Sequence, residues 1–298
     1  MSSLHCCGKV ACTDDASTRV MKFGADNTDM PVVPPSLPVP GQGQPDNTGA
    51  KWTISGLFLG LVAVLLGLAA VMVVLPGYAR LEVFPFVLAG WLISLCLHEF
   101  GHAIAAYGSG DRSVREKGYL TLDPLRYTDL QFSIVWPLVF LAIGGIGLPG
   151  GAVYVNKRAL RSPVHRALVS AAGPLATLAV LIGLLAVMHA ARSASAAAPT
   201  LYAALAFLAF LQLTALVLTL LPIPGLDGWG IIEPLLPSAV REFGVRVAGI
   251  APTFLFLLLL LVPAVNTMFW RLVFNLCRMT GLGAEWPMQG LFLFQFWR

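Results

Sequence analysis

Charge is the scarcest property of this 298-residue chain: only 11% of its residues are Asp, Glu, Lys or Arg, whereas 57% are hydrophobic. The mean hydropathy is +0.78. Soluble domains carry about 25% charged residues, so this composition excludes a soluble globular protein and predicts an integral membrane protein in contact with a lipid bilayer. The net charge of +4 is small and spread along the chain. It therefore excludes the dense basic face that binds nucleic acid.

Cysteine is also scarce, with five residues whose spacing forms no disulfide framework. No apolar h-region opens the chain, so we expect no cleaved signal peptide.

Residues 1–50 are polar and hold six prolines between Pro31 and Pro45, which predicts a disordered cytosolic tail with a Pro-rich linker. A small cluster in this tail is either a metal site or, because a second Cys-x-x-Cys pair is missing, part of an unstructured, reduced tail. Its members are His5, Cys6, Cys7 and Cys12.

Long uncharged or nearly uncharged runs take the place of the missing charge. About 20 apolar residues suffice to cross the hydrocarbon of a bilayer, so each run predicts a transmembrane helix. We expect an all-α polytopic membrane protein with about five to six transmembrane helices in a domain over residues 51–278. Residues 279–298 are expected to form an amphipathic aromatic tail at the interface. Within one run, Gly173-Pro174 is expected to interrupt the helix. The runs cover residues 52–79, 83–107, 167–188, 200–221 and 247–270.

A further uncharged stretch, residues 130–156, is not a plain helix, because glycines and Pro149 crowd its second half. The sequence Gly150-Gly151-Ala-Val-Tyr-Val predicts a short membrane-associated β-strand. We expect the stretch to be re-entrant, with a full membrane crossing as the alternative.

The pentapeptide His98-Glu99-Phe100-Gly101-His102 lies near the end of an apolar run that begins at Val83. Ionisable groups within a membrane are costly and usually mark a site. Positions i and i+4 of a helix share a face, so His98 and His102 can bind one cation, while Glu99 can polarise a metal-bound water. This spacing is typical of zinc hydrolases with an HExxH helix. The alternative, two histidines of a polar surface helix, is disfavoured by the apolar surroundings.

A zinc site of this kind needs a third protein ligand, with water in the fourth position. Asp227 is the main candidate, because it ends a long uncharged stretch and lies among helix-breaking prolines and glycines. Its alternative role is that of an N-cap at the start of the next helix. His165, in a basic loop, and His189, at the opposite end of its span, are weaker candidates.

Four motifs occur in a fixed order along the chain: HEFGH at 98–102, Pro149-Gly150-Gly151-Ala-Val, Ala172-Gly173-Pro174-Leu175 and Leu226-Asp227-Gly228. In this order they resemble the site-2 protease family of intramembrane zinc metalloproteases, in a bacterial form without a PDZ domain. The resemblance covers roughly residues 83–235.

The resemblance implies that His98, His102 and Asp227 bind Zn²⁺ and that Glu99 is the catalytic base. It also implies that Gly150 and Gly151 lie near the active-site cleft and help hold an extended substrate segment.

The sequence departs from the family pattern at three positions. Thr177 and Thr219 stand where the family usually has asparagine, and Trp229 follows Gly228 where a second glycine is usual. A threonine hydroxyl cannot reproduce both functions of a carboxamide, so the details of the substrate contacts of Thr177 and Thr219 are expected to differ.

The function expected from these features is hydrolysis of peptide bonds in or near transmembrane segments of other proteins, in a bacterial inner membrane. One alternative is a non-proteolytic scaffold with a vestigial metal site. A metal transporter would need further intramembrane carboxylates or histidines, and the sequence offers none.

The metal ligands must meet at one membrane depth, which constrains the topology. If the N-terminus is cytosolic, the ends of the segment 108–162 both face the cytosol, which favours the re-entrant reading of residues 130–156. This segment carries seven Lys and Arg residues, as the positive-inside rule requires.

Overall fold

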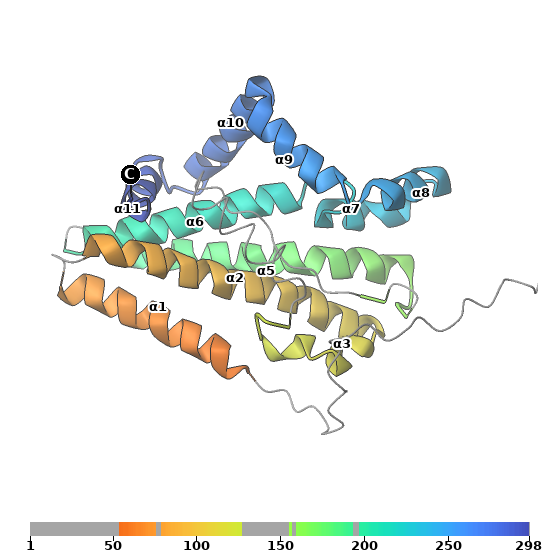
Figure 1. Cartoon of the computed structure of the whole chain (residues 1–298), viewed down its shortest axis with the longest axis horizontal. Helices are drawn as coiled ribbons and strands as arrows, with labels where there is room; N and C mark the ends of the chain where they lie inside the picture. The colour runs from red at the N-terminus through yellow and green to blue at the C-terminus, as the bar shows by residue number, and fades with distance from the viewer. Residues whose placement is uncertain (1–53, 76–78, 127–154, 157–158, 193–196, 298) are drawn as a thin grey trace, which may run out of the picture. The chain divides into compact units, whose positions relative to one another are not determined.

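A computed structural model of the chain describes residues 54–75, 79–126, 155–156, 159–192 and 197–297 (Figure 1). Four of its helices are long and apolar enough to cross a membrane: α1 (Gly56–Val74), α2 (Ala79–Ser109), α5 (Pro163–Ala190) and α6 (Pro199–Thr219). Their limits follow from local chemistry. The Ser55 hydroxyl accepts a hydrogen bond from Leu57 N at the start of α1, and Ser162 caps α5, whose first residue is Pro163.

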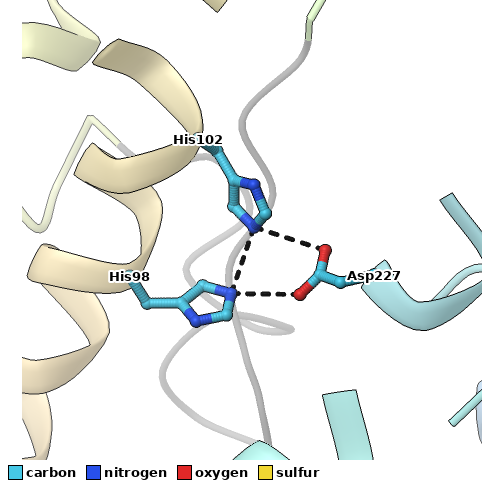
Figure 2. Close-up of side chains that lie close together, drawn as sticks. All are labelled: His98, His102 and Asp227. Carbon is cyan, nitrogen blue, oxygen red and sulfur yellow. Dashed lines mark hydrogen bonds and ion pairs between the residues drawn. The ribbon is translucent and has the colours of Figure 1, made fainter. Parts of the chain in front are cut away.

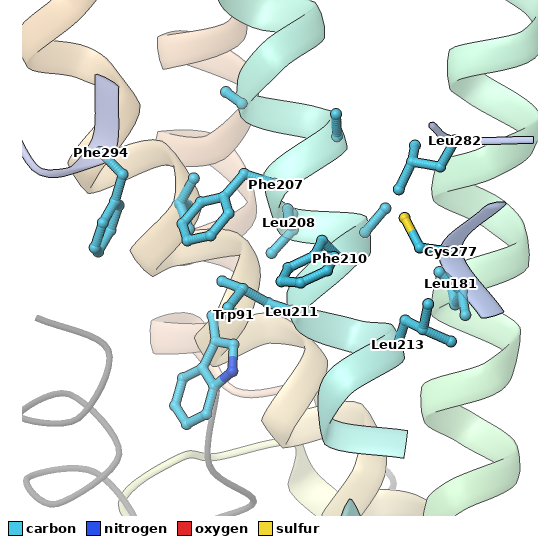
Figure 3. Packing of buried hydrophobic residues seen from close by; sticks show 14 of the residues in the cluster. Trp91, Leu181, Phe207, Leu208, Phe210, Leu211, Leu213, Cys277, Leu282 and Phe294 are labelled. Carbon is cyan, nitrogen blue, oxygen red and sulfur yellow. The ribbon is translucent and has the colours of Figure 1, made fainter. Parts of the chain in front are cut away.

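Helix α6 is the centre of the packing. In its apolar stretch 67% of the residues are buried, against 6% in α1. Helices α2 and α5 pack against α6 and against each other, and α1 lies along α2. Phe207 and Leu211 of α6 are fully buried in the core between these helices (Figure 3). The bundle therefore leaves α1 mostly exposed and encloses α6.

The C-terminal aromatic residues extend this core. Helix α11 (Glu285–Phe294) packs against α6 and α2. The ring of Phe294 is fully buried, with its centroid 5.3 Å from that of Phe207 and 5.0 Å from that of Phe84.

The predicted single span over residues 247–270 is wrong in detail, because short helices replace it. Helix α8 (Ser238–Val247) and α9 (Ala251–Leu261) are bent by 70° relative to each other, and α10 (Pro263–Met279) starts at a new proline. Pro252 and Pro263 lack a backbone N–H and sit in the first turn of a helix, so each marks a new start. The described residues hold four spans, or up to five if the bent pair counts as one, against a prediction of five to six.

The described part of the chain is all-helical, without strands. The predicted strand and re-entrant segment at 130–156 lie outside the described residues, apart from Val155 and Asn156, which belong to no strand. The N-terminal cluster of His5 and its neighbouring cysteines is likewise outside them. The predicted interruption at Gly173-Pro174 is wrong: α5 continues through Pro174 as one helix.

The two described ends that flank this region lie together. Arg161 N donates to Ser109 O at 3.2 Å, and Asn156 N donates to the Asp111 carboxylate at 2.7 Å. Between them, after α2, come α3 (Ser113–Glu116) and the short 3₁₀ helix η1 (Tyr119–Thr121). The C-terminal end of α2 and the N-terminal end of α5 thus lie on the same side of the bundle, as the expected topology requires.

Candidate metal centre

Three side chains from two distant parts of the chain converge at one point (Figure 2). His98 and His102 lie one turn apart on α2, and Asp227 is the first residue of the short helix α7 (Asp227–Ile232). The two Nε2 atoms are 3.1 Å apart. Asp227 Oδ2 lies 3.2 Å from His98 Nε2, and its Oδ1 lies 3.3 Å from His102 Nε2.

The three residues form a ligand triangle whose nearest donor atoms, with each histidine paired to its nearer Asp227 oxygen, are 3.1–3.3 Å apart; one donor atom per residue can be chosen with all three within 4.8 Å of one another. Bonds of about 2.0–2.1 Å in a tetrahedron give ligand separations of about 3.3–3.4 Å. Among the described residues, His98, His102 and Asp227 form the one group of three or more His, Cys, Asp or Glu able to hold a metal ion. Three protein ligands are the number found in catalytic zinc sites, where water or substrate takes the fourth position, whereas structural sites have four.

Hydrogen bonds behind the imidazoles fix which ring nitrogens face the centre. His102 Nδ1 lies 2.7 Å from Val169 O, a carbonyl that only accepts, so this nitrogen donates and the Nε2 of the neutral ring keeps its lone pair. His98 Nδ1 lies 2.8 Å from Thr177 Oγ1, which can accept in the same way. Both bonds resemble the outer contacts that orient metal-binding histidines.

Asp227 supplies the negative charge. Burial works to raise the pKa of its carboxyl, but the His102 and His98 imidazoles outweigh burial and hold that pKa below its usual range. A carboxylate and two imidazoles thus converge on one point. Such a set of electron-pair donors suits a cation, so the three residues fit a metal ion.

A tight turn brings Asp227 to the histidines. After α6, Leu226 N donates to Ile223 O at 3.0 Å across Pro224 and Gly225, and Gly225 has φ +94°. Proline followed by a residue with positive φ is the signature of a type II turn, which explains the Pro-Gly pair. The N-cap position of α7 belongs to Leu226, with no side-chain cap bond, so the alternative role of Asp227 as an N-cap does not apply.

Two glycines let α2 and α5 approach closely at the site. A Cβ on Gly101 would lie 2.6 Å from Ala172 O. A Cβ on Gly173 would overlap His102 Nε2 and lie 2.6 Å from His98 Nε2. Gly173 therefore leaves the space in which the two imidazoles meet, a role that its motif does not reveal in the sequence.

Replacing Gly173 by alanine is expected to abolish metal binding, because the added methyl group would displace both imidazoles. Zinc bound per purified chain measures this. Gly183→Ala on the same helix is the matched control, since a Cβ there meets nothing within 4 Å and should leave zinc content unchanged. Full zinc occupancy in Gly173→Ala would contradict the assigned packing.

Glu99 follows His98 on α2 and is only 3% exposed, but its carboxylate is not one of the three converging groups. Glu99 is thus adjacent to His98 in the sequence and buried, without belonging to the ligand triangle.

Two cavities reach the centre. One of about 370 Å³ borders His102 and Asp227 and is lined further by residues of α5, α7 and α8, including Arg166 and Ser170, and by Glu233 of the short 3₁₀ helix η4 (Glu233–Leu235). A smaller one, of about 30 Å³, borders His98 between α2, α5 and α6. The larger cavity offers a route for water to the ligands.

The other predicted site residues do not belong to the ligand triangle. Thr177 is bonded to His98 itself, and the Thr219 hydroxyl donates to Leu216 O while the residue lines the small cavity. Gly150 and Gly151 lie outside the described residues. His165 Nδ1 is 2.7 Å from the Ser162 hydroxyl at the start of α5, and neither His165 nor His189 belongs to the metal group.

Apolar helices around a buried His-His-Asp centre define a multi-pass membrane protein with a metal-binding site of catalytic type. The chain is 45% identical over 260 residues to "Putative zinc metalloprotease Rip2" of Mycobacterium tuberculosis, covering 84% of this chain and 97% of that protein. It is 40% identical to the protein of the same name from Mycolicibacterium smegmatis, over 72% of this chain and 82% of that one. The chain is 31% identical to "Putative zinc metalloprotease YwhC" of Bacillus subtilis, over 66% of this chain and 89% of that protein.

The chain belongs to the site-2 protease family. No family model matches it, and no solved structure matches it.

Proposed function

We propose that this chain is an intramembrane zinc metalloprotease that hydrolyses peptide bonds within or near transmembrane segments of other membrane proteins. The observation that carries the proposal is the convergence of His98, His102 and Asp227 inside a bundle of apolar helices, with one donor atom of each within 4.8 Å of the others and nearest contacts of 3.1–3.3 Å. A vestigial scaffold would have no reason to keep these groups buried in fitting geometry. A transporter would need a path of further metal-binding clusters, and the described residues hold no second cluster of three or more such side chains.

Each residue of the centre has a separate task. His98, His102 and Asp227 would hold Zn²⁺, which when bound supplies a Lewis acid that lowers the pKa of water toward 7 and polarises a carbonyl. Glu99 accepts the proton of the attacking water and delivers it to the leaving amine. Thr177 and Val169 O hold the two imidazoles in the orientation that directs Nε2 at the centre.

The substrate must unwind before it is cut, because the carbonyls of a transmembrane helix are occupied by i→i−4 hydrogen bonds. Helix-breaking residues in the substrate should therefore favour cleavage. Gly150 and Gly151 would pair with the unwound segment as an added strand, and Thr177 and Thr219 would lie next to it.

We place the protein in the bacterial inner membrane, with its N-terminus in the cytosol. Two observations support this orientation. The backbone N–H of Arg161 donates a hydrogen bond to the backbone carbonyl of Ser109 at one side of the bundle, and the segment from Ser109 through Arg161 contains seven Lys and Arg residues.

Cysteine labelling tests this orientation in a chain whose own five cysteines are replaced by alanine. Arg112→Cys and Arg161→Cys should react with an impermeant thiol reagent only once the cytosolic side is opened. Arg192→Cys, beyond the other end of α5, should react from outside. Labelling of position 161 from outside would overturn the orientation and the re-entrant reading of residues 130–156.

The proteolytic function is tested with the full chain in vesicles and a co-reconstituted reporter. This transmembrane reporter has one leucine-rich transmembrane helix interrupted by Asn-Pro. The zinc-loaded chain should cleave the reporter within that helix, a chelator should stop cleavage, and added zinc should restore it. A zinc-loaded chain that leaves the reporter intact counts against proteolysis and favours the scaffold.

A further inference from the structure

Gln212 is a buried polar side chain that the proposed chemistry does not use. It lies in the middle of α6 and is 2% exposed, and its Nε2 has no hydrogen-bond partner in the described part of the chain. Buried donors are nearly always paired, because an unpaired one loses its bond to water without replacement. An orphaned carboxamide in the most buried helix therefore needs an explanation.

The side chain borders the small cavity of about 30 Å³ beside His98. Two other polar residues of its lining have already used their hydroxyl hydrogens: Ser94 donates to Gly90 O at 2.8 Å and Thr219 donates to Leu216 O at 3.1 Å. Gln212 lines the same cavity, and rotation about the last torsion of its side chain exchanges the positions of Oε1 and Nε2, so the partnerless Nε2 can be directed at a group in the cavity.

Thr177 adds a second donor to the same space. His98 Nδ1 lies 2.8 Å from Thr177 Oγ1, and metal binding through His98 Nε2 would place the proton on Nδ1. In that tautomer the Thr177 oxygen accepts, its own O–H remains to be donated, and Thr177 also lines the cavity. Two donors that border one space next to a metal ligand are suited to a single oxygen acceptor. The volume has room for about one small group, since a water in the liquid occupies about 30 Å³.

We propose that Gln212 is a substrate-binding residue whose Nε2 donates a hydrogen bond to a backbone carbonyl oxygen of the unwound substrate segment, seated in the small cavity beside His98. This inference rests on the proposed function. The physical reason lies in the membrane: a carbonyl freed by unwinding in lipid finds no water and must be satisfied by protein donors. Gln212 and Thr177 supply such donors at the depth of the metal centre.

The proposal predicts an unusual pair of effects for Gln212→Met, which keeps the length of the side chain but removes its donor. The free protein should keep its zinc and its melting temperature, or melt higher, because an orphaned donor is gone. Binding of the transmembrane reporter should become about tenfold weaker, the loss expected for one hydrogen bond. A structural role would have the opposite effect on melting.

The experiment measures zinc content, melting temperature and reporter Kd for the full chain in a Glu99→Gln background, where the reporter stays uncut. Gln212→Leu repeats the test with a second apolar side chain. Thr214→Val is the matched control: Thr214 lies on the same helix, is fully buried and donates to Phe210 O, but does not line the cavity. It should leave the Kd unchanged.

An unchanged Kd in both Gln212 variants overturns the proposal and leaves the cavity to a structural water. A lowered melting temperature or lost zinc also overturns it. If the chain with Glu99 intact cleaves the reporter while the Gln212 variants bind it normally, only this inference fails. If that chain neither cleaves nor binds the reporter, the proposed function fails with it.

Discussion

Glu99→Gln is expected to bind zinc as fully as the unchanged chain while its cleavage of the transmembrane reporter falls at least about 100-fold, the usual contribution of a general base. The amide has the shape of the carboxylate but cannot accept the proton of water. The ligand triangle does not include Glu99, so the metal should remain.

Zinc analysis and reporter cleavage on the same preparation check this result. Glu116→Gln makes the same chemical change at an exposed position of α3, and it should leave both measurements unchanged. Turnover of Glu99→Gln above a few per cent of the unchanged chain would show that another group is the base.

Asp227→Ala is expected to lose both zinc and activity. The substitution removes one of three protein donors and the negative charge that faces two imidazole nitrogens at 3.2 and 3.3 Å. With two ligands left, affinity for zinc should fall by orders of magnitude, so the purified variant should contain little metal.

Asp123→Ala is the matched control, because that carboxylate bonds to Leu125 N and to the Arg126 side chain and does not belong to the metal group. It should keep its zinc. Stoichiometric zinc in Asp227→Ala, with cleavage lost, would remove Asp227 from the ligands and require a different third donor.

The spacing of His98 and His102 already predicted that their side chains share a face, because i and i+4 contacts are a property of any α-helix. Asp227 was predicted as the third metal ligand because the apolar half of the chain has few other ionisable residues. In the structure, a type II turn at Pro224-Gly225 precedes Asp227 and directs it toward the histidines. The Pro-Gly signature of this turn is also a local feature of the sequence.

Other features of the site could not be derived in this way. The sequence did not indicate that Thr177 Oγ1 lies within hydrogen-bond distance of His98 Nδ1; its predicted contact with substrate stays a prediction. The Gly173-Pro174 pair was expected to break a helix, and instead α5 continues while Gly173 makes room for both imidazoles. Gln212 gave no signal at all, since a single polar residue in an apolar helix does not show whether it has a partner.

The sequence by itself determined the class of protein, the positions of the four long apolar helices and the presence of a two-histidine motif in one of them. These depend on composition, on the length of uncharged runs and on contacts within one or two helical turns. Only the tertiary structure decided the distances among His98, His102 and Asp227 and the absence of a partner for the Gln212 amide in the described part of the chain. The reason is physical: periodicity fixes which face a side chain occupies, whereas packing between helices fixes what that face meets.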